Sequence, residues 1–340
     1  DDLPLQRWLN EKIFPAEDRL NEERVYTGSM LAIAEMLKNG VVSFSDMYFF
    51  LDETARAVEQ TGIKANLSRS IVSFDKNADF SKDTRVLESI DVFERWNGRA
   101  DGRIKIDMSL HAEYSNVVEC FDYVGALTKK LGTGFQIHVS ETSSEHEECI
   151  ARHGLTPTAF LEAHGVLDNP VTAAHCVWVS DDDIKIMAKR GVSVAHNAVS
   201  NLKLGSGIMP YKKMHKAGVN VTLGTDGAAS NNRLSVLREL QFATLIHKGN
   251  DLDPSVTIAG DMIKVATRNG AIAQGRDDCG EIRVGMKADL LLIDMSAINN
   301  IPAYSFESAV CYAMTEENIL MTVCDGNILY EDHAYTTIDE

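Results

Sequence analysis

Five ionisable residues recur at matching places, each near the end of a short apolar run: His111 in SLHAEY, His138 in FQIHVSET, His175 in TAAHCVW, His196 in VAHNAVSN and Asp226 in TLGTDGAASNN. Taken alone, such a histidine is more often a satisfied core or surface residue than a ligand. An Asp in GTDG is more often a turn or cap residue. Five independent coincidences in one register are hard to accept, so the pattern favours a shared site.

Imidazoles and a carboxylate suit a divalent transition metal such as zinc, and an open coordination position can hold a water molecule. A bound metal lowers the pKa of that water enough to make it a nucleophile near neutral pH. The attack also needs a group that moves protons. Glu141, three residues after His138, is placed for this role. The residue types therefore predict metal-assisted hydrolysis.

The apolar runs alternate with longer stretches of helical spacing, which is typical of parallel βαβ units. Helical spacing is seen at Glu53–Thr61, Lys82–Trp96, Val117–Leu131 and Asp181–Arg190. A further helix, Tyr26–Lys38, ends at Asn39-Gly40 ahead of the first run, so one more strand is expected before it. Seven strands are predicted within Gly40–Met47, Ile63–Val72, Ile104–His111, Gly134–Ser140, Val171–Trp178, Val192–His196 and Val219–Thr225.

Seven strands and the expected one make eight, the number that closes a TIM-type barrel with its active site at the carboxyl ends of the strands. The alternative is an open doubly wound sheet, which would carry its ligand after a Gly-rich turn. No GxGxxG follows any of the runs. The sequence therefore predicts an α/β fold, a (β/α)8 barrel lacking its first strand, with residues 1–275 as the hydrolase domain.

Residues 276–340 are predicted to be the remnant of a small β-sandwich domain. Thr257–Ala273 is expected to form one helix, and Gly280–Asp294 and Met321–Tyr330 are expected to form turn-linked strands. These strands are too few to be stable alone. We therefore expect a partner segment ahead of Asp1, where the chain begins without Met.

Composition narrows the class of protein. A chain of 340 residues with 44% hydrophobic residues can bury a full core, and its formal charge of −17 argues against nucleic acid or an anionic membrane as partner. The six cysteines form no CxxC pair, which favours reduced thiols in a cytoplasmic protein. No apolar run approaches the roughly 18 residues of a membrane span. A homo-oligomer is left open.

Several longer motifs resemble the signature strands of the amidohydrolase superfamily, namely HVSETSSEHEE, TAAHCVW, SNLKLGSG and TLGTDGAASNN. The amino-acid sequences of these motifs are similar to those of the methylthioadenosine/S-adenosylhomocysteine deaminases. The opening segment DDLPLQRWLNEKIFPAE and the closing segment GEIRVGMKADLLLID resemble the same family. The resemblance covers essentially the whole chain. It implies hydrolytic deamination of adenosine derivatives, such as 5′-methylthioadenosine and S-adenosylhomocysteine, to the inosine products with release of ammonia.

The resemblance also implies roles for individual residues. His138 would be a metal ligand, and Asp226 would bind the metal and take a proton from the water. His175 would orient the resulting hydroxide, and Glu141 would protonate the purine ring nitrogen. The metal would be zinc, with Fe²⁺ as the alternative.

The substrate, a small nucleoside, would be held by residues from other parts of the chain. His111 would contact the nucleoside. Trp8 and Glu17 would reach in from the first loop, with Glu17 accepting hydrogen bonds from the ribose hydroxyls. Arg69 and Arg85 would face the ribose and the 5′ substituent, although ordinary surface salt bridges explain the two arginines nearly as well. His196 and Asn197 would begin a loop that shapes the site without binding metal. The other histidines are expected to be ordinary: His146, His153, His164, His215, His247 and His333.

The chain departs from the family at one point, since it contains no His-x-His pair, which the family places on the first strand. Only two protein ligands for one ion then remain, which is weak for tight zinc binding, and this chain by itself is expected to have little activity. Two alternatives stay open: a related amidohydrolase, such as a guanine-type deaminase or a triazine-type chlorohydrolase, and an inactive, metal-free relative. The zinc deaminases with HxE and PCxxC are excluded, because no PCxxC occurs.

Overall fold

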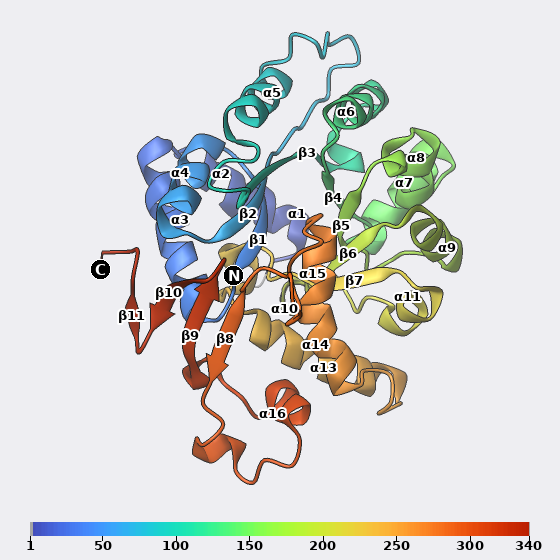
Figure 1. Cartoon of the computed structure of the whole chain (residues 1–340). Coiled ribbons are helices and arrows are strands. Elements are labelled where there is room, and N and C mark those ends of the chain that lie inside the picture. The colour runs from blue at the N-terminus through green and yellow to red at the C-terminus, as the bar shows by residue number, and fades with distance from the viewer. Residues whose placement is uncertain (1–2, 340) are drawn as a thin grey trace.

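The centre of the molecule is a curved sheet of seven parallel strands (Figure 1). The computed structural model describes residues 3–339. The strands lie in the sheet in the order in which they occur in the chain, and each pairs with its sequence neighbours. None extends more than one residue beyond its predicted range, so the predicted alternation is confirmed. The strands are β1 (Ser43–Tyr48), β2 (Lys64–Arg69), β3 (Ile104–Ala112), β4 (Phe135–Val139), β5 (Val171–His175), β6 (Ser193–His196) and β7 (Asn220–Leu223).

The sheet is open within the described part of the chain, because its edge strands β1 and β7 are not paired with each other. In an eight-stranded barrel, the strand that the sequence analysis expects before β1 would lie between β1 and β7. The arrangement is therefore that of a TIM-type barrel lacking its first strand, as predicted. The domain division between residues 275 and 276 stays a prediction.

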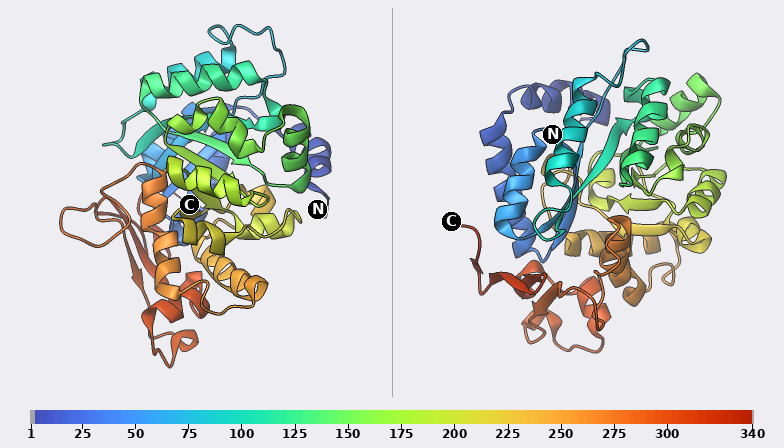
Figure 2. Two further views of the ribbon diagram at one scale, coloured as in Figure 1. Left: turned by 90° about the vertical axis from the view of Figure 1, so that its right-hand side faces the viewer. Right: turned by 45° about the horizontal axis from the view of Figure 1, so that its top comes forward.

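Helices follow the strands in turn and cover the outer face of the sheet (Figures 1 and 2). Within residues 3–339, none of them combines the length and apolar character needed to cross a membrane. Those that flank the barrel strands are α3 (Glu22–Lys38), α4 (Leu51–Thr61), α5 (Thr84–Trp96), α6 (Val118–Leu131), α7 (Ser143–His153), α8 (Pro157–Ala163), α9 (Asp181–Arg190), α10 (Ala198–Lys203), α11 (Tyr211–Ala217), α12 (Ala228–Asn231), α13 (Val236–Asp251), α14 (Ala259–Ala266) and α15 (Arg268–Ala273).

Helix α9 illustrates how local sequence fixes these elements. The Ser180 hydroxyl accepts the backbone N–H of Asp183, and the Asp183 carboxylate accepts the backbone N–H of Ser180, which together form a capping box. Ile184 and Met187 lie on one face of the helix and are buried. Gly191 ends the helix with φ of 68°, a conformation that favours glycine.

The segment predicted as one helix, Thr257–Ala273, forms two. Helix α14 ends at Ala266, and the next residue, Thr267, has φ of −125° and ψ of −89°, which break the helical path. The next helix, α15, turns toward β7, and the Asn269 amide donates to the backbone carbonyl of Val221 at 2.8 Å. Docking on the sheet therefore outweighs the continuous helical pattern of the sequence.

The C-terminal residues form a second, antiparallel sheet in the order β11-β10-β9-β8. Its strands are β8 (Leu290–Ile293), β9 (Ile319–Cys324), β10 (Asn327–Glu331) and β11 (Ala334–Tyr335), and helix α16 (Phe306–Tyr312) lies between β8 and β9. The prediction of strand structure from Gly280 is wrong for residues 280–289, which form turns. Ile282 and Val284 alternate with polar residues as in a strand, but both are almost fully exposed.

A buried ion cluster joins this second sheet to the barrel. Lys64, at the start of β2, pairs with Asp289, just before β8, and with Asp325, just after β9, at 2.6 Å. All three side chains are at least nine-tenths buried. Asp325 has a second cation, Lys287, at 3.3 Å, whereas Lys64 is the only ion-pair partner recorded for Asp289 in the described chain. Lys64 thus neutralises charge at a buried junction.

The substitution Lys64→Met is expected to destabilise the fold strongly, because it leaves Asp289 buried without its cation. Breaking a buried pair in this way costs about 3–5 kcal/mol in the free energy of unfolding. Urea denaturation measures this loss, and Lys185→Met, in the exposed pair with Asp182, is the control, with little change expected. Equal behaviour of the two variants would show that the buried cluster does not hold the sheets together.

Candidate active site

The opening of the barrel lies at the carboxyl ends of the strands, since polar side chains fill the other end. The Asp107 carboxylate on β3 accepts hydrogen bonds from the Asn66 amide on β2 at 3.0 Å and from the Gln136 amide on β4 at 2.9 Å. Asp107 and Gln136 therefore face the interior. Because side chains two apart on a strand share a face, His111 and His138 face the same interior, closer to the carboxyl ends.

His138 is held in one orientation by the backbone. Its Nδ1 lies 2.8 Å from the carbonyl oxygen of His111. A carbonyl can only accept, so Nδ1 carries the proton and Nε2 keeps a free lone pair. Burial, followed by the neighbouring His175, lowers the pKa of His138 and keeps its ring neutral. This is the state of the side chain that a metal requires.

His175 ends β5, and its ring lies beside that of His138. Its ring stacks on that of His138 with centroids 5.4 Å apart, and the centroid of His138 lies 5.0 Å from that of His111. The His175 Nδ1 is 2.8 Å from the Asn201 side-chain oxygen, which leaves Nε2 3.7 Å from the Glu141 carboxylate. Burial opposes a charge on His175, but the carboxylates of Glu141 and Asp226 outweigh it and raise its pKa.

Asp226 follows β7 and is held by two donors. The Ser200 hydroxyl donates to one carboxylate oxygen at 2.6 Å and the Gly227 N–H to the other at 2.7 Å. Burial works against the Asp226 charge, yet nearby His175 and the Ser200 hydroxyl hold its pKa below the ordinary value. The group is therefore a carboxylate at neutral pH.

Glu141 is buried at the mouth and is fixed through its own backbone. Its carboxylate accepts the Ser206 hydroxyl at 3.1 Å. The N–H groups of Ser140 and Glu141 donate to the buried carboxylate of Glu145, on α7, at 2.8 and 2.7 Å. Burial raises the pKa of Glu145 to about 7. The turn after β4 thus presents Glu141 from a fixed backbone.

Backbone strain collects around these side chains. Ser140, His175, Cys176 and Asp226 all have positive φ, between 47° and 71°, although none is glycine. They lie at or just past the carboxyl ends of β4, β5 and β7. Such conformations cost of order 1–3 kcal/mol each and cluster at functional sites. The strained backbone therefore indicates that the candidate active site lies at this end of the barrel.

The N-terminal segment runs past two of the strand ends. It comprises α1 (Leu5–Trp8), the π-helix η1 (Leu9–Ile13) and α2 (Phe14–Glu17). Gln6 hydrogen-bonds to Tyr114, which follows β3, and Glu17 hydrogen-bonds to Tyr48, which ends β1. Burial raises the pKa of Glu17, and the Tyr48 hydroxyl opposes that shift. Trp8 is buried in the same segment, so Trp8 and Glu17 belong to a segment at the mouth.

The two arginines predicted near the ribose are engaged with carboxylates of the chain. Arg69 pairs with Glu88 at 2.7 Å, and its guanidinium lies over the Phe49 ring. Arg85 pairs with Asp83 at 2.5 Å. Within residues 3–339, neither guanidinium bonds to His138, His175 or Asp226. The geometry fits the alternative of ordinary salt bridges.

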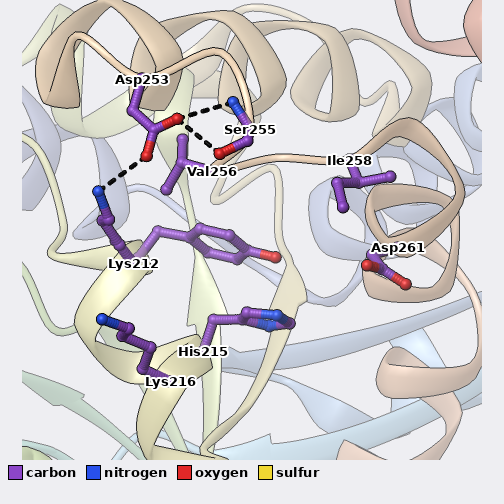
Figure 3. A pocket seen from close by; sticks show the side chains of 9 residues that line it. Lys212, His215, Lys216, Asp253, Ser255, Val256, Ile258 and Asp261 are labelled. Carbon is purple, nitrogen blue, oxygen red and sulfur yellow. Dashed lines mark hydrogen bonds and ion pairs between the residues drawn. The ribbon is translucent and has the colours of Figure 1, made fainter.

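His196 is paired with a histidine from a helix. Its Nε2 is 3.0 Å from Nε2 of His247 on α13, both rings are buried, and both Nδ1 atoms lack a hydrogen-bond partner in the described structure. The His247 ring stacks on Tyr211, which lines a separate cavity of about 160 Å³ between α11 and residues 253–261. Figure 3 shows that cavity with its own ion pair, Lys212 with Asp253.

Sequence reasoning missed the residues that hold the site in place. Ser200, Asn201 and Ser206 all lie in or beside the quoted motif SNLKLGSG, and each bonds to a residue named above. Glu145 lies in HVSETSSEHEE. The motifs pointed to the right segments, but only the contacts distinguish these side chains from their neighbours.

His138 and Asp226 are suited to hold a divalent metal, since one offers a free Nε2 and the other a carboxylate. Among residues 3–339, no three His, Cys, Asp or Glu side chains are grouped closely enough to enclose an ion. Catalytic zinc has three protein ligands as a rule. The two residues fit the chemistry of the ion and would supply part of its coordination.

Comparison with known proteins assigns the chain to a family. The model of the Amidohydrolase family matches residues 1–329. A 5-methylthioadenosine/S-adenosylhomocysteine deaminase of Acetivibrio thermocellus is 43% identical over 341 residues, which cover 100% of this chain and 78% of the relative. A 5′-deoxyadenosine deaminase of Methanosarcina barkeri is 41% identical over 343 residues, with shares of 100% and 78%.

A solved structure agrees with these relatives. The crystal structure of an adenosine deaminase from Xanthomonas campestris with bound zinc has a TM-score of 0.94 and 33% identity to this chain. The match covers 100% of this chain and 77% of that one. Family model, relatives and structure all match along essentially the whole sequence, and the protein therefore belongs to the amidohydrolase family.

Proposed function

We propose that the protein is a metal-dependent aminohydrolase that converts adenosine derivatives, such as 5′-methylthioadenosine and S-adenosylhomocysteine, into the inosine products with release of ammonia. The observation that carries the proposal is the convergence of Glu141, His175 and Asp226 on the ring of His138. The deaminases of adenosine derivatives among the relatives support the substrate class.

The bound metal, zinc in the solved relative, supplies the positive charge that makes water nucleophilic near neutral pH. His138 and Asp226 would hold the ion. Asp226, whose carboxylate is ionised, would accept a proton from the water that attacks carbon 6 of the purine. His175, whose Nε2 lies 3.7 Å from the Glu141 carboxylate, would orient the attacking oxygen.

Glu141 would donate its proton to the purine ring nitrogen next to the attacked carbon. The amine would leave as ammonia with the proton that Asp226 has taken from the water, and the proton on the attacking oxygen would return to the carboxyl group of Glu141 as the carbonyl forms. The Ser206 hydroxyl and the Glu145 clamp keep this carboxyl group in place. His111 and Trp8 border the base, and Glu17 accepts hydrogen bonds from the ribose hydroxyls. Ribose contacts by Arg69 and Arg85 require that each exchange its present carboxylate partner for the substrate.

The substitution Glu141→Gln tests the proton-transfer role in the zinc-loaded, full-length protein. General acid–base groups contribute about 10²–10⁴-fold, so kcat for release of ammonia from methylthioadenosine should fall by that factor. Zinc content should not change, because Glu141 is not a proposed ligand. The exposed Glu147 on α7 provides the control, and Glu147→Gln should retain full activity.

Two outcomes would contradict this proposal in different ways. Retention of at least a tenth of the activity by Glu141→Gln would remove Glu141 from proton transfer. A zinc-loaded protein that releases no ammonia from any purine nucleoside would instead favour an inactive relative.

Glu17→Gln tests the ribose contact. A hydrogen bond to a charged acceptor contributes roughly 1.5–3 kcal/mol, so kcat/KM for adenosine should fall by about ten- to a hundredfold. The value for 2′,3′-dideoxyadenosine, which lacks both hydroxyls, should change little. Glu23→Gln, an exposed carboxylate on α3, is the control. Equal losses for the two nucleosides would exclude Glu17 from binding ribose.

A further inference from the structure

A fully buried carboxylate lies behind the site and takes no part in the proposed chemistry. Glu239 is on α13 and has an exposed fraction of 0%. Both of its carboxylate oxygens accept hydrogen bonds. The backbone N–H of Val199 donates to one oxygen at 3.1 Å, and the side-chain amide of Asn231 donates to the other at 2.6 Å. The two donors belong to two different loops of the barrel mouth.

The first oxygen fixes the loop after β6. Asn197 precedes α10 but makes no side-chain cap bond, so the free N–H groups at the start of this helix need another acceptor. Glu239 provides it from a separate helix. The same short helix carries Ser200, which donates to Asp226, and Asn201, which bonds to Nδ1 of His175.

The second oxygen fixes the loop after β7. The Asn231 amide group has two hydrogens, and it also donates to the backbone carbonyl of Thr225 at 2.7 Å. Thr225 directly precedes Asp226. Glu239 and Asn231 therefore connect the loop that orients His175 with the backbone next to Asp226.

We propose that Glu239 is a positioning residue, which ties α10 to the loop after β7 and so sets the placement of His175 relative to Asp226. This inference rests on the proposed deaminase function for its kinetic test. Misplacement of reacting groups by about 1 Å can cost on the order of 10²-fold in rate, without loss of substrate binding. Glu239 should therefore act on kcat and leave KM nearly unchanged.

The test is Glu239→Gln, which keeps the size of the side chain but presents one donor and one acceptor where two N–H groups now donate. In the zinc-loaded, full-length protein we expect kcat for methylthioadenosine to fall about ten- to a hundredfold, with KM within twofold. Glu53→Gln replaces another buried carboxylate, on α4 and far along the chain from these loops, and should leave kcat unchanged.

A double-mutant cycle separates positioning from general destabilisation. If Glu239 acts through α10, the loss in Glu239→Gln combined with Asn201→Ala should be smaller than the product of the single losses. Multiplicative losses would overturn the proposal. If Glu239→Gln fails to fold, Asn231→Ala breaks the same connection from the other side. It should lower kcat at constant KM, and unchanged kcat would overturn the proposal.

A readout independent of turnover distinguishes this inference from the proposed function. The proton on His175 Nδ1 is protected by Asn201, and Asn201→Ala identifies its NMR signal. We expect this proton to exchange with water several-fold faster in Glu239→Gln than in the parent protein or in Glu53→Gln. Unchanged exchange would overturn the positioning role even in a protein without deaminase activity. If the parent protein has no deaminase activity and exchange is still faster in Glu239→Gln than in that parent, the positioning role is supported while the proposed function fails.

Discussion

The arrangement of the site depends on one hydrogen bond, from Nδ1 of His138 to the carbonyl oxygen of His111 at 2.8 Å. Because this acceptor belongs to the backbone of the neighbouring strand, the ring cannot turn without disturbing the sheet. The bond fixes the tautomer as well as the direction of the ring. Nε2 thereby keeps a free electron pair on a ring that lies beside His175 and Asp226, and the proposed metal binding requires that electron pair.

The same solution recurs at the other side chains, at a cost in backbone strain. The Nδ1 of His175 is hydrogen-bonded to Asn201, and the Asp226 carboxylate accepts the Ser200 hydroxyl. The backbone N–H of Glu141 donates to the Glu145 carboxylate. Ser200 and Asn201 come from helix α10, and Glu145 comes from α7, the helix that directly follows Glu141. The strained turns at Ser140, His175 and Asp226 persist because these bonds compensate for them. Rigid loops keep the charged groups aligned without rearrangement during the reaction.

The positions of His111, His138, His175 and Asp226 could be predicted because parallel strands impose a common register, and their ends must lie together. Ser200, Asn201 and Glu239 could not. Ser200 and Asn201 each bond to a residue 26 positions away, and Glu239 bonds to Val199, 40 positions away. Local pattern also failed at residues 280–289, where Ile282 and Val284 alternate as in a strand without a partner to cover them. His247 was expected to be ordinary, but it pairs with His196, because only the packing of α13 on β6 brings the two rings together.

Anomalous diffraction at the zinc absorption edge, from crystals of the full-length protein, tests the central claim most directly. We expect one ion bonded to Nε2 of His138 and to the Asp226 carboxylate at about 2.0–2.2 Å. Glu141 and His175 should border the ion without being bonded to it. An ion on the His196–His247 pair instead, or full zinc occupancy without contact to His138, would contradict the proposed site.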